Sequence, residues 1–173
     1  MAQPPRKSAP TSGQPLISNK EIKLRVYGRP APQGSKVAVA KGVMKEVSTY
    51  LKPWRTDVKE TAREQYKGEA LDVPVMLNVT FLFDRPKSHY RTGKHAHLLK
   101  DGASDWVVAK NRGDLSKLVR STEDALSVSS GGSVITDDSL IAKTLAMKVY
   151  CMEGEEPGAI IRIKLLPNLR ALP

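Results

Sequence analysis

The sequence contains a single cysteine, Cys151, among 173 residues, which excludes an intrachain disulfide. A chain without disulfides is typical of a reducing compartment. No apolar run approaches the ~20 residues that a membrane-spanning helix needs. The N-terminal stretch MAQPPRKSAPTSGQP also lacks the apolar segment of a signal peptide. We therefore expect a soluble protein of the cytoplasm that has no membrane partner.

Two familiar ligand motifs are also missing. The stretch GRPAPQGSK lacks the GxxxxGK[ST] spacing of a phosphate-binding loop, so we expect no nucleotide cofactor. His89, His95 and His97 lie close together in the sequence, but no cysteine or acidic partner at helical spacing accompanies them. This pattern argues against a zinc site.

Positive charge is what the chain has in excess. There are 28 Lys and Arg residues against 18 Asp and Glu residues, a formal net charge of +10. Such an excess favours polyanionic partners, because each neutralised phosphate releases counterions. Charge alone does not separate specific from non-specific binding of nucleic acid.

The hydrophobic pattern predicts one domain between two tails. Residues 1–18 are rich in Pro, Ser, Gly and Gln and predict a disordered tail, residues 19–167 form the domain, and residues 168–173 form a C-terminal tail. Apolar residues recur with a period of two in strands and of about four in helices. Strands are predicted at 21–28, 75–83, 139–152 and 158–166, a short hairpin at 37–47 turning at Lys41–Gly42, and helices at 53–68 and 115–126. This order predicts an α/β or α+β fold with two main helices on a single mixed sheet.

The second predicted helix carries the first candidate site. Asp114 stands at its start, where an aspartate caps the free amides of the first turn. The polar face of the helix carries Ser116, Lys117, Arg120, Glu123 and Asp124. One interpretation is a capped helix with a solvated charged face, in which Arg120 pairs with Glu123 or Asp124. The alternative is part of a metal site.

A second acidic feature supports the metal site. Asp137 and Asp138 directly precede a predicted strand, although paired aspartates are also common turn residues. Mg²⁺ prefers hard oxygen ligands and is often held by one or two carboxylates with water and substrate phosphate. We expect an acidic helix start to lie beside an acidic strand start, within an otherwise basic surface.

Together, GDLSKLVRSTEDAL and VITDDSLIAK resemble the signature of the RusA family of Holliday-junction resolvases, which phages and prophages commonly encode. The upstream segments VYGRPAPQGSK, KPWR and RPKSHYRTGK resemble the N-terminal half of the same family. The resemblance covers residues 22–166 and rests on the order of five linked segments. It implies a RusA-like fold and a homodimeric, Mg²⁺-dependent endonuclease, with Mn²⁺ as an alternative ion. Its substrate would be branched DNA, which it cuts at four-way junctions, in the bacterial host cytoplasm if a phage encodes it.

The resemblance also implies roles for individual residues. Asp114 matches the first family aspartate and Asp138 the essential member of the second pair, so both are expected to be catalytic and to bind the metal. Arg120 occupies the place of a catalytic basic residue. Asp137 is expected to support the turn and is a third candidate metal ligand.

Ser116 departs from the family pattern, which has an aspartate there. A hydroxyl can ligate Mg²⁺ but brings no negative charge. Glu123 lies roughly 10 Å further along the helix and is too distant to replace the missing carboxylate directly. Three functions therefore remain open: a resolvase, a junction-binding protein with reduced or no nuclease activity, and a general basic RNA- or DNA-binding module in which the acidic residues are only caps and turns.

Basic residues outside the helix predict the DNA contacts. The segment between the predicted strand at 75–83 and the second helix is long for a loop and lacks a sustained period, which is typical of functional or mobile loops. It is interpreted as an arm that contacts phosphates, the alternative being an exposed basic loop. The expected DNA-binding residues are Lys36, Lys87, Arg91, Lys94, Lys110, Arg112 and Lys117.

Overall fold

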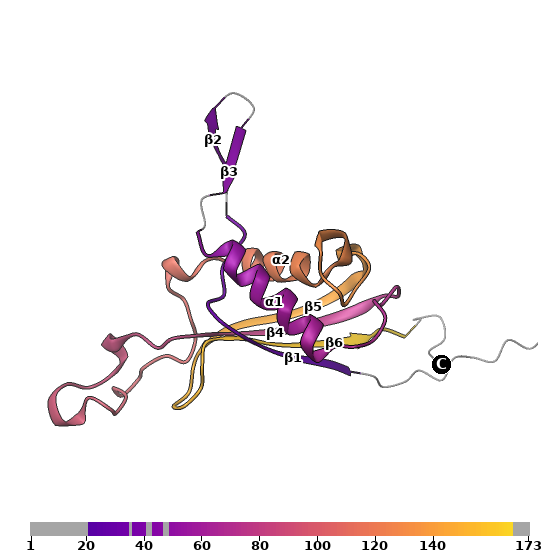
Figure 1. Ribbon diagram of the computed structural model, residues 1–173. Coiled ribbons are helices and arrows are strands. Elements are labelled where there is room, and N and C mark those ends of the chain that lie inside the picture. Colours follow the sequence, from indigo (N-terminus) through magenta and orange to yellow (C-terminus); the bar gives the residue numbers. More distant parts are fainter. Residues whose placement is uncertain (1–20, 35, 41–42, 47–48, 168–173) are drawn as a thin grey trace, which may run out of the picture.

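A four-stranded mixed sheet, covered on one face by two helices, forms the centre of the molecule (Figure 1). This computed structural model describes residues 21–34, 36–40, 43–46 and 49–167. The predicted tails, residues 1–18 and 168–173, lie outside the described residues, so their boundaries stay predictions. The α+β fold with a single mixed sheet and two main helices is confirmed.

The strand order within the sheet is β1-β6-β4-β5. β4 and β5 are parallel, whereas β6 pairs antiparallel with both β1 and β4. A helix, α2, provides the crossover between the parallel strands, as such a connection requires. The strands of the sheet are β1 (Glu21–Tyr27), β4 (Val75–Phe83), β5 (Ile141–Tyr150) and β6 (Gly158–Leu165), and the helices are α1 (Leu51–Gln65) and α2 (Leu115–Leu126).

The core lies between the helices and one face of the sheet. Alternate residues of β1, β4 and β6 are buried there, which is the period that the sequence predicts. Trp54, Val58 and Ala62 of α1 meet them from above. The indole N–H of Trp54 donates to the hydroxyl of Thr122 on α2 at 3.2 Å, so the two helices share one buried polar contact.

Several predicted boundaries differ from the structure by one to three residues, and two of the shifts, at the starts of α1 and β5, have a clear physical reason. α1 begins at Leu51, two residues before Pro53, because the first turn of a helix needs no amide donor and tolerates proline. β5 begins at Ile141 instead of residue 139, because Asp138–Leu140 form a short 3₁₀ turn, η5. The predicted hairpin is confirmed as β2 (Lys36–Ala40) and β3 (Val43–Glu46), while its turn residues lie outside the described part.

The long segment between β4 and α2 is irregular, as predicted. It holds three 3₁₀ turns, η1 (Lys87–His89), η2 (Gly93–His95) and η3 (Lys110–Arg112), and it extends away from the sheet (Figure 1). Cys151 follows β5 directly and is buried. None of the helices in the described residues is long and apolar enough to cross a membrane.

Candidate active site

The turn that starts α2 presents the carboxylate of Asp114. Gly113 precedes it with φ 78°, and a Cβ at this position would lie 2.6 Å from Cγ of Pro32, so the turn requires glycine. Asp114 occupies the N-cap position, but its side chain makes no capping hydrogen bond, contrary to the sequence expectation. The carboxylate is 73% exposed, and its one ion pair within the described part of the chain is with the ammonium of Lys117, at 3.4 Å. Its oxygens therefore remain available to a ligand.

Ser116 and Arg120 follow on the exposed side of α2. In the described part of the chain, Arg120 forms no ion pair within 4.0 Å. Asp124, one of its two expected partners, instead pairs with Arg55 of α1. Arg120 is thus available to a negatively charged ligand.

A second acidic group lies at the other end of α2. The Ser139 side chain lowers the pKa of the Asp137 carboxyl, and the backbone N–H of Ser139, which donates to Asp137 at 3.0 Å, lowers it further. Asp137 thereby caps η5, which agrees with its expected role in the turn. Burial raises the pKa of the Glu123 carboxyl. The hydrogen bond from the Thr144 hydroxyl opposes this shift, and the negative charge of Asp138 adds to it. Asp138 itself is exposed.

Contacts between α2 and β5 fix the positions of the acidic groups at the two ends of α2, Asp114 at its start and Glu123 near its end. The Lys148 ammonium donates to the carbonyl oxygen of Gly113 at 2.8 Å, and the Thr144 hydroxyl donates to Glu123 at 3.4 Å. α2 and β5 therefore run in opposite directions, and Figure 1 shows α2 starting beside the long irregular segment and ending beside residues 127–140. Asp114 and Glu123 are nine positions apart in the sequence, a rise of roughly 13 Å along the helix axis.

Within one chain, the described contacts place Asp114 and Asp138 toward opposite ends of α2. Mg²⁺ needs its oxygen ligands at about 2.0–2.1 Å, whereas these aspartates belong to opposite ends of α2. No group of three or more His, Cys, Asp or Glu side chains that could hold an ion occurs among the described residues. The start of α2 and the start of β5 were expected to lie side by side, but they lie apart within one chain. The reason is that a crossover helix between parallel strands begins near the end of the first strand and finishes near the start of the second. The ligand assignment stays a prediction.

Comparison with known proteins identifies the family. The family model for Endodeoxyribonuclease RusA matches residues 28–164, which include both acidic groups and Arg120. The chain belongs to the RusA endodeoxyribonuclease family. A search of curated proteins found no match. The RusA family is one of Holliday-junction resolvases that act on branched DNA, and nucleases of this kind generally use a divalent metal.

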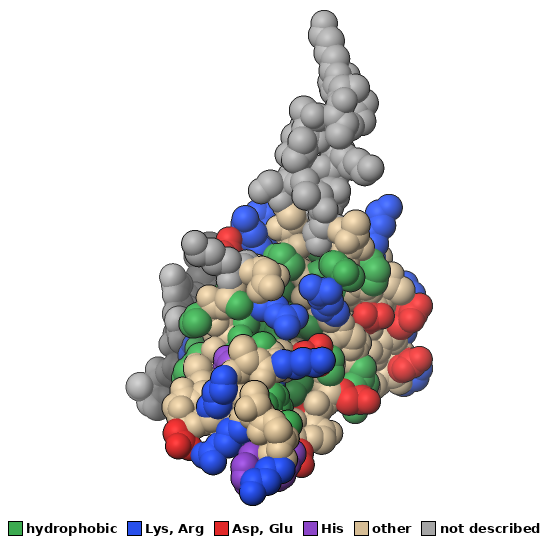
Figure 2. Space-filling model, turned by 90° about the vertical axis from the view of Figure 1, so that its left-hand side faces the viewer, with side chains coloured by type: hydrophobic (Ala, Val, Ile, Leu, Met, Phe, Trp, Pro, Cys, Tyr) green, Lys and Arg blue, Asp and Glu red, His purple; other side chains and the backbone are tan. Residues whose placement is uncertain are grey.

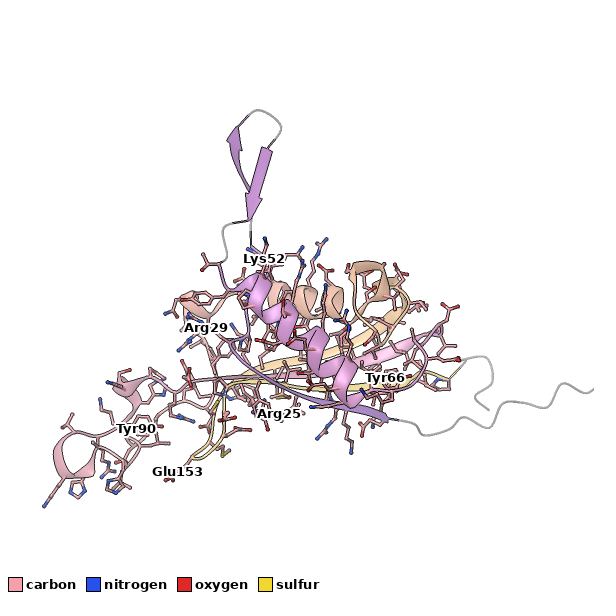
Figure 3. All side chains as sticks on the ribbon, in the orientation of Figure 1. Arg25, Arg29, Lys52, Tyr66, Tyr90 and Glu153 are labelled. Atoms are coloured by element: carbon pink, nitrogen blue, oxygen red, sulfur yellow. The ribbon has the colours of Figure 1, made fainter. Side chains whose placement is uncertain are left out.

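For a RusA-family chain, the surface around Asp114 has the expected positive charge. A pocket of about 210 Å³ adjoins the α2 turn, lined by Arg29, Pro30, Ala31, Pro32, Tyr50, Phe83, Asn111 and Arg112. Arg29 stacks over the ring of Tyr50 at 4.0 Å, and Arg112 lies 5.6 Å from the ring centroid of Phe83. Figure 3 shows Arg29 and Lys52 on the same side, near the start of α1. A phosphate near this pocket would meet two guanidinium groups.

The basic arm between β4 and α2 is exposed, and its contacts with DNA stay a prediction. Lys87 and Lys94 project from η1 and η2 and form no ion pair with any described residue. The guanidinium of Arg91 is partly committed, since it pairs with Asp101 at 2.8 Å and donates to the carbonyl of Leu99. Figure 2 shows Lys and Arg side chains spread over this end of the molecule.

The four remaining residues that are predicted to bind DNA differ in how far the structure describes them. Lys117 is exposed beside Asp114, and Arg112 lines the pocket. The side chains of Lys36 and Lys110 lie outside the described part of the structure. Arg29 was not predicted, because its arrangement depends on tertiary contact with Tyr50. The sequence feature that could have predicted Arg29 is its place in the segment GRP, where a basic residue stands in a loop directly after a strand.

Proposed function

We propose that this chain is a Mg²⁺-dependent, structure-specific endonuclease that resolves four-way DNA junctions. The observation that carries the proposal is the exposed, uncapped carboxylate of Asp114 beside a pocket that contains Arg29 and Arg112. Hydrolysis of a phosphodiester needs this combination, because positive groups hold the DNA backbone while carboxylates hold a metal ion at the phosphate.

Asp114 and Asp138 are the proposed sources of metal-binding oxygens, with Mg²⁺ or Mn²⁺ as the ion, although they lie toward opposite ends of α2 within one chain. When bound, such an ion polarises the scissile phosphate and lowers the pKa of an attacking water. Arg120 would stabilise negative charge that develops on the phosphate. Asp137 would hold the η5 turn and so fix the backbone beside Asp138.

Branched DNA and a second copy of the chain are the proposed partners. Resolution of a junction requires two symmetric cuts, and a closed twofold dimer provides two equivalent sites. The arm with Lys87, Arg91 and Lys94 would contact phosphates away from the cut. A place of action in the cytoplasm, that of a bacterial host for a phage-encoded protein, agrees with this substrate.

A junction-binding protein with reduced or no nuclease activity is the second candidate. Ser116 supports it, because an exposed hydroxyl stands where the family signature has an aspartate. The nearest acidic group further along the same face, Glu123, is half-buried and next to Asp138. Ser116 itself would therefore leave the metal with less negative charge.

Cleavage of a synthetic four-way junction tests the proposal. The labelled junction and a linear duplex of the same sequence are incubated with the full chain, with Mg²⁺ and with EDTA. We expect paired cuts in the junction alone and only with Mg²⁺. Selective binding to the junction without cleavage supports the second candidate. Equal binding to the junction and the duplex contradicts both.

A further inference from the structure

A second and larger pocket lies at the base of the basic arm. Its volume is about 470 Å³, against about 210 Å³ for the pocket beside the α2 turn. Sites for small organic groups commonly measure about 300–1,000 Å³, so the larger of the two has room for such a group. Its walls include Tyr90 and Leu99 of the arm, Met152 and Glu153 of the turn between β5 and β6, and Arg85 and Asp105. Figure 3 shows Tyr90 and Glu153 at the same end of the molecule.

The polar part of this pocket is already formed without a ligand. The Arg85 side chain is only 6% exposed. Its guanidinium donates to Asp105 at 2.6 Å and to the carbonyl oxygen of Ser104 at 2.9 Å, and it lies 5.5 Å from the ring centroid of Tyr150. Paired and bidentate bonds of this kind hold a guanidinium in one orientation. The donors and acceptors of the pocket therefore keep their places.

The two walls offer flat and soft surfaces. Tyr90 pairs with Leu99 in an antiparallel bridge, and the N–H of Lys100 donates to the carbonyl oxygen of His89 at 2.8 Å, so the base of the arm is closed. The Tyr90 hydroxyl makes no hydrogen bond with the residues that the structure describes. Met152, from the turn between β5 and β6, is 73% exposed. An aromatic ring and a thioether are both favourable neighbours for a planar ring system.

Charge distinguishes the ligands of the two pockets. The larger pocket carries one guanidinium, of Arg85, and two carboxylates, of Asp105 and Glu153. Arg85 is paired with Asp105, whereas Glu153 forms no ion pair within the described part of the chain. The pocket beside the α2 turn has Arg29 and Arg112 and no acidic lining residue. A phosphate therefore suits the smaller pocket, and a neutral planar group with a hydrogen-bond donor suits the larger one.

The two pockets lie close together, at the ends of β4 and β5. The N–H of Cys151, which lines the larger pocket, donates at 2.9 Å to the carbonyl oxygen of Phe83, which lines the smaller one. The guanidinium of Arg112 also donates to the carbonyl oxygen of Asp84 at 3.4 Å. A DNA strand with a phosphate beside the α2 turn therefore brings its neighbouring nucleotides within reach of the larger pocket.

We propose that this pocket takes one unpaired base of the branched DNA, with the base ring against Tyr90 and its exocyclic amino group donating to Glu153. This inference rests on the proposed function, which supplies the DNA. Extrusion of a base costs least where its pair is already weakened, and the crossing point of a branched DNA interrupts the stack of pairs. Adenine, cytosine and guanine carry an amino group and thymine does not, so the pocket disfavours thymine.

A cycle of abasic DNA and protein variants tests the stacking contact. Four-way junctions that each carry one abasic residue, at successive positions from the crossing point, are bound in EDTA so that none is cut. We expect one position at which the missing base weakens binding of the wild type about tenfold. Tyr90→Leu should bind the intact junction about tenfold more weakly and show no further loss with that abasic junction.

Two variants control the cycle. Tyr90→Phe keeps the ring and should bind as the wild type does. Tyr27→Leu removes a ring that is 55% exposed on β1, outside the pocket, and should keep the full abasic effect. A loss in Tyr90→Leu that is equal for intact and abasic junctions, or no loss at all, overturns the proposal.

A photochemical cross-link locates the base directly. The position found by the cycle is replaced by 5-iodocytosine, which keeps the amino group and couples to a neighbouring aromatic side chain on irradiation. We expect the cross-linked peptide to contain Tyr90 in the wild type and in Tyr27→Leu, and the product to be lost in Tyr90→Leu. Cross-links to other peptides without one at Tyr90 overturn the proposal.

Replacement of Glu153 tests the contact with the amino group. At the same position, the wild type should bind a junction with cytosine about tenfold more tightly than one with thymine. Glu153→Gln should lose this preference, because an amide can donate to thymine as well as accept from cytosine. Glu156→Gln, exposed on the same turn but outside the pocket, is the matched control and should keep it. Equal binding of the two junctions by the wild type overturns the role of Glu153.

These measurements separate the failure of this inference from the failure of the proposed function. A chain that binds junctions selectively but cuts none in Mg²⁺ contradicts the nuclease, while the abasic cycle in EDTA still decides whether a base is captured. A chain that cuts junctions but shows no abasic position coupled to Tyr90 overturns the base pocket alone.

Discussion

Lys148, near the end of β5, donates a hydrogen bond of 2.8 Å from its ammonium to the carbonyl oxygen of Gly113. Gly113 directly precedes Asp114 at the start of α2. β5, an edge strand of the sheet, therefore holds the turn that presents the proposed catalytic carboxylate. The position of Asp114 depends on a residue 34 places away in the sequence.

Lys148→Met should lower the rate of junction cleavage more than it lowers junction affinity. Methionine keeps most of the apolar stem and removes the donor, so the turn loses one bond that contributes about 0.5–1.5 kcal/mol of stability. A small displacement of a reacting group reduces kcat, by about tenfold here. Single-turnover cleavage and junction Kd are measured side by side. Lys164→Met, on β6 of the same sheet, is the control, and an unchanged cleavage rate in Lys148→Met would contradict a positioning role.

Asp138→Asn should abolish cleavage and leave junction binding intact. The amide preserves the size of the side chain but removes the charge that a metal ligand needs. Cleavage in Mg²⁺ and binding in Ca²⁺ or EDTA are compared by gel. Asp137→Asn is the matched control, because its oxygen can still accept the Ser139 bond, and it should keep most of the activity. Retained cutting by Asp138→Asn removes it from the metal site.

Ser116→Asp should increase cleavage or reduce the Mg²⁺ concentration required for half-maximal cleavage. The new carboxylate restores the family pattern and adds negative charge near Asp114. It also stands in the first turn of α2, where negative charge stabilises a helix by about 0.3–1 kcal/mol. A Mg²⁺ titration of cleavage measures the first effect and thermal unfolding the second. A Mg²⁺ curve that coincides with that of wild type shows that Ser116 does not limit the metal site.

The sequence predicted the buried faces well, because they depend on local periodicity. The alternation in β4 and the fourfold spacing of Trp54, Val58 and Ala62 report burial directly. The separation of Asp114 and Asp138 was missed. It follows from the parallel pairing of β4 with β5, which no local pattern reports across the long irregular segment between β4 and α2.

The contact partners of individual polar side chains were also not predictable from the sequence. An aspartate before a helix favours capping, yet Asp114 contacts Lys117 instead. Asp124 pairs with Arg55 of α1, a contact between distant segments, so one of the two partners expected for Arg120 is already engaged. Local rules describe which side chains are near in sequence, whereas packing of α1 on α2 decides which charges meet.

Glu123→Gln should stabilise the fold near neutral pH and have little effect in acid. Burial and the neighbouring Asp138 raise the pKa of Glu123 above its usual value of 4.5, so its ionisation is less favourable in the folded than in the unfolded chain. The resulting loss of stability is absent below pH 4.5, grows as pH rises toward the folded pKa and is complete above it. Thermal unfolding of both proteins from about pH 4 to 8 should show curves that diverge with rising pH. A constant difference would contradict the raised pKa.

Neutralising the basic arm should weaken DNA binding broadly and flatten its dependence on salt. Lys87→Gln, Arg91→Gln and Lys94→Gln are combined in one chain, because all three project from the exposed segment between β4 and α2. Removing one side chain that neutralises a phosphate reduces the slope of log K against log salt by about 0.9. Arg91 already pairs with Asp101, so the two lysines should dominate and the slope should fall by about 2.

A control variant loses the same number of positive charges at a different place on the molecule. It distinguishes phosphate contacts of the arm from an effect of net charge. Lys23→Gln, Arg162→Gln and Lys164→Gln remove three exposed charges from β1 and β6, on the sheet face away from the helices. Because counterion release counts only groups that contact phosphate, this control should keep the wild-type slope. Equal slopes for both triple variants would show that the arm acts only through overall charge, and an unchanged slope in the arm variant would place the DNA elsewhere on the molecule.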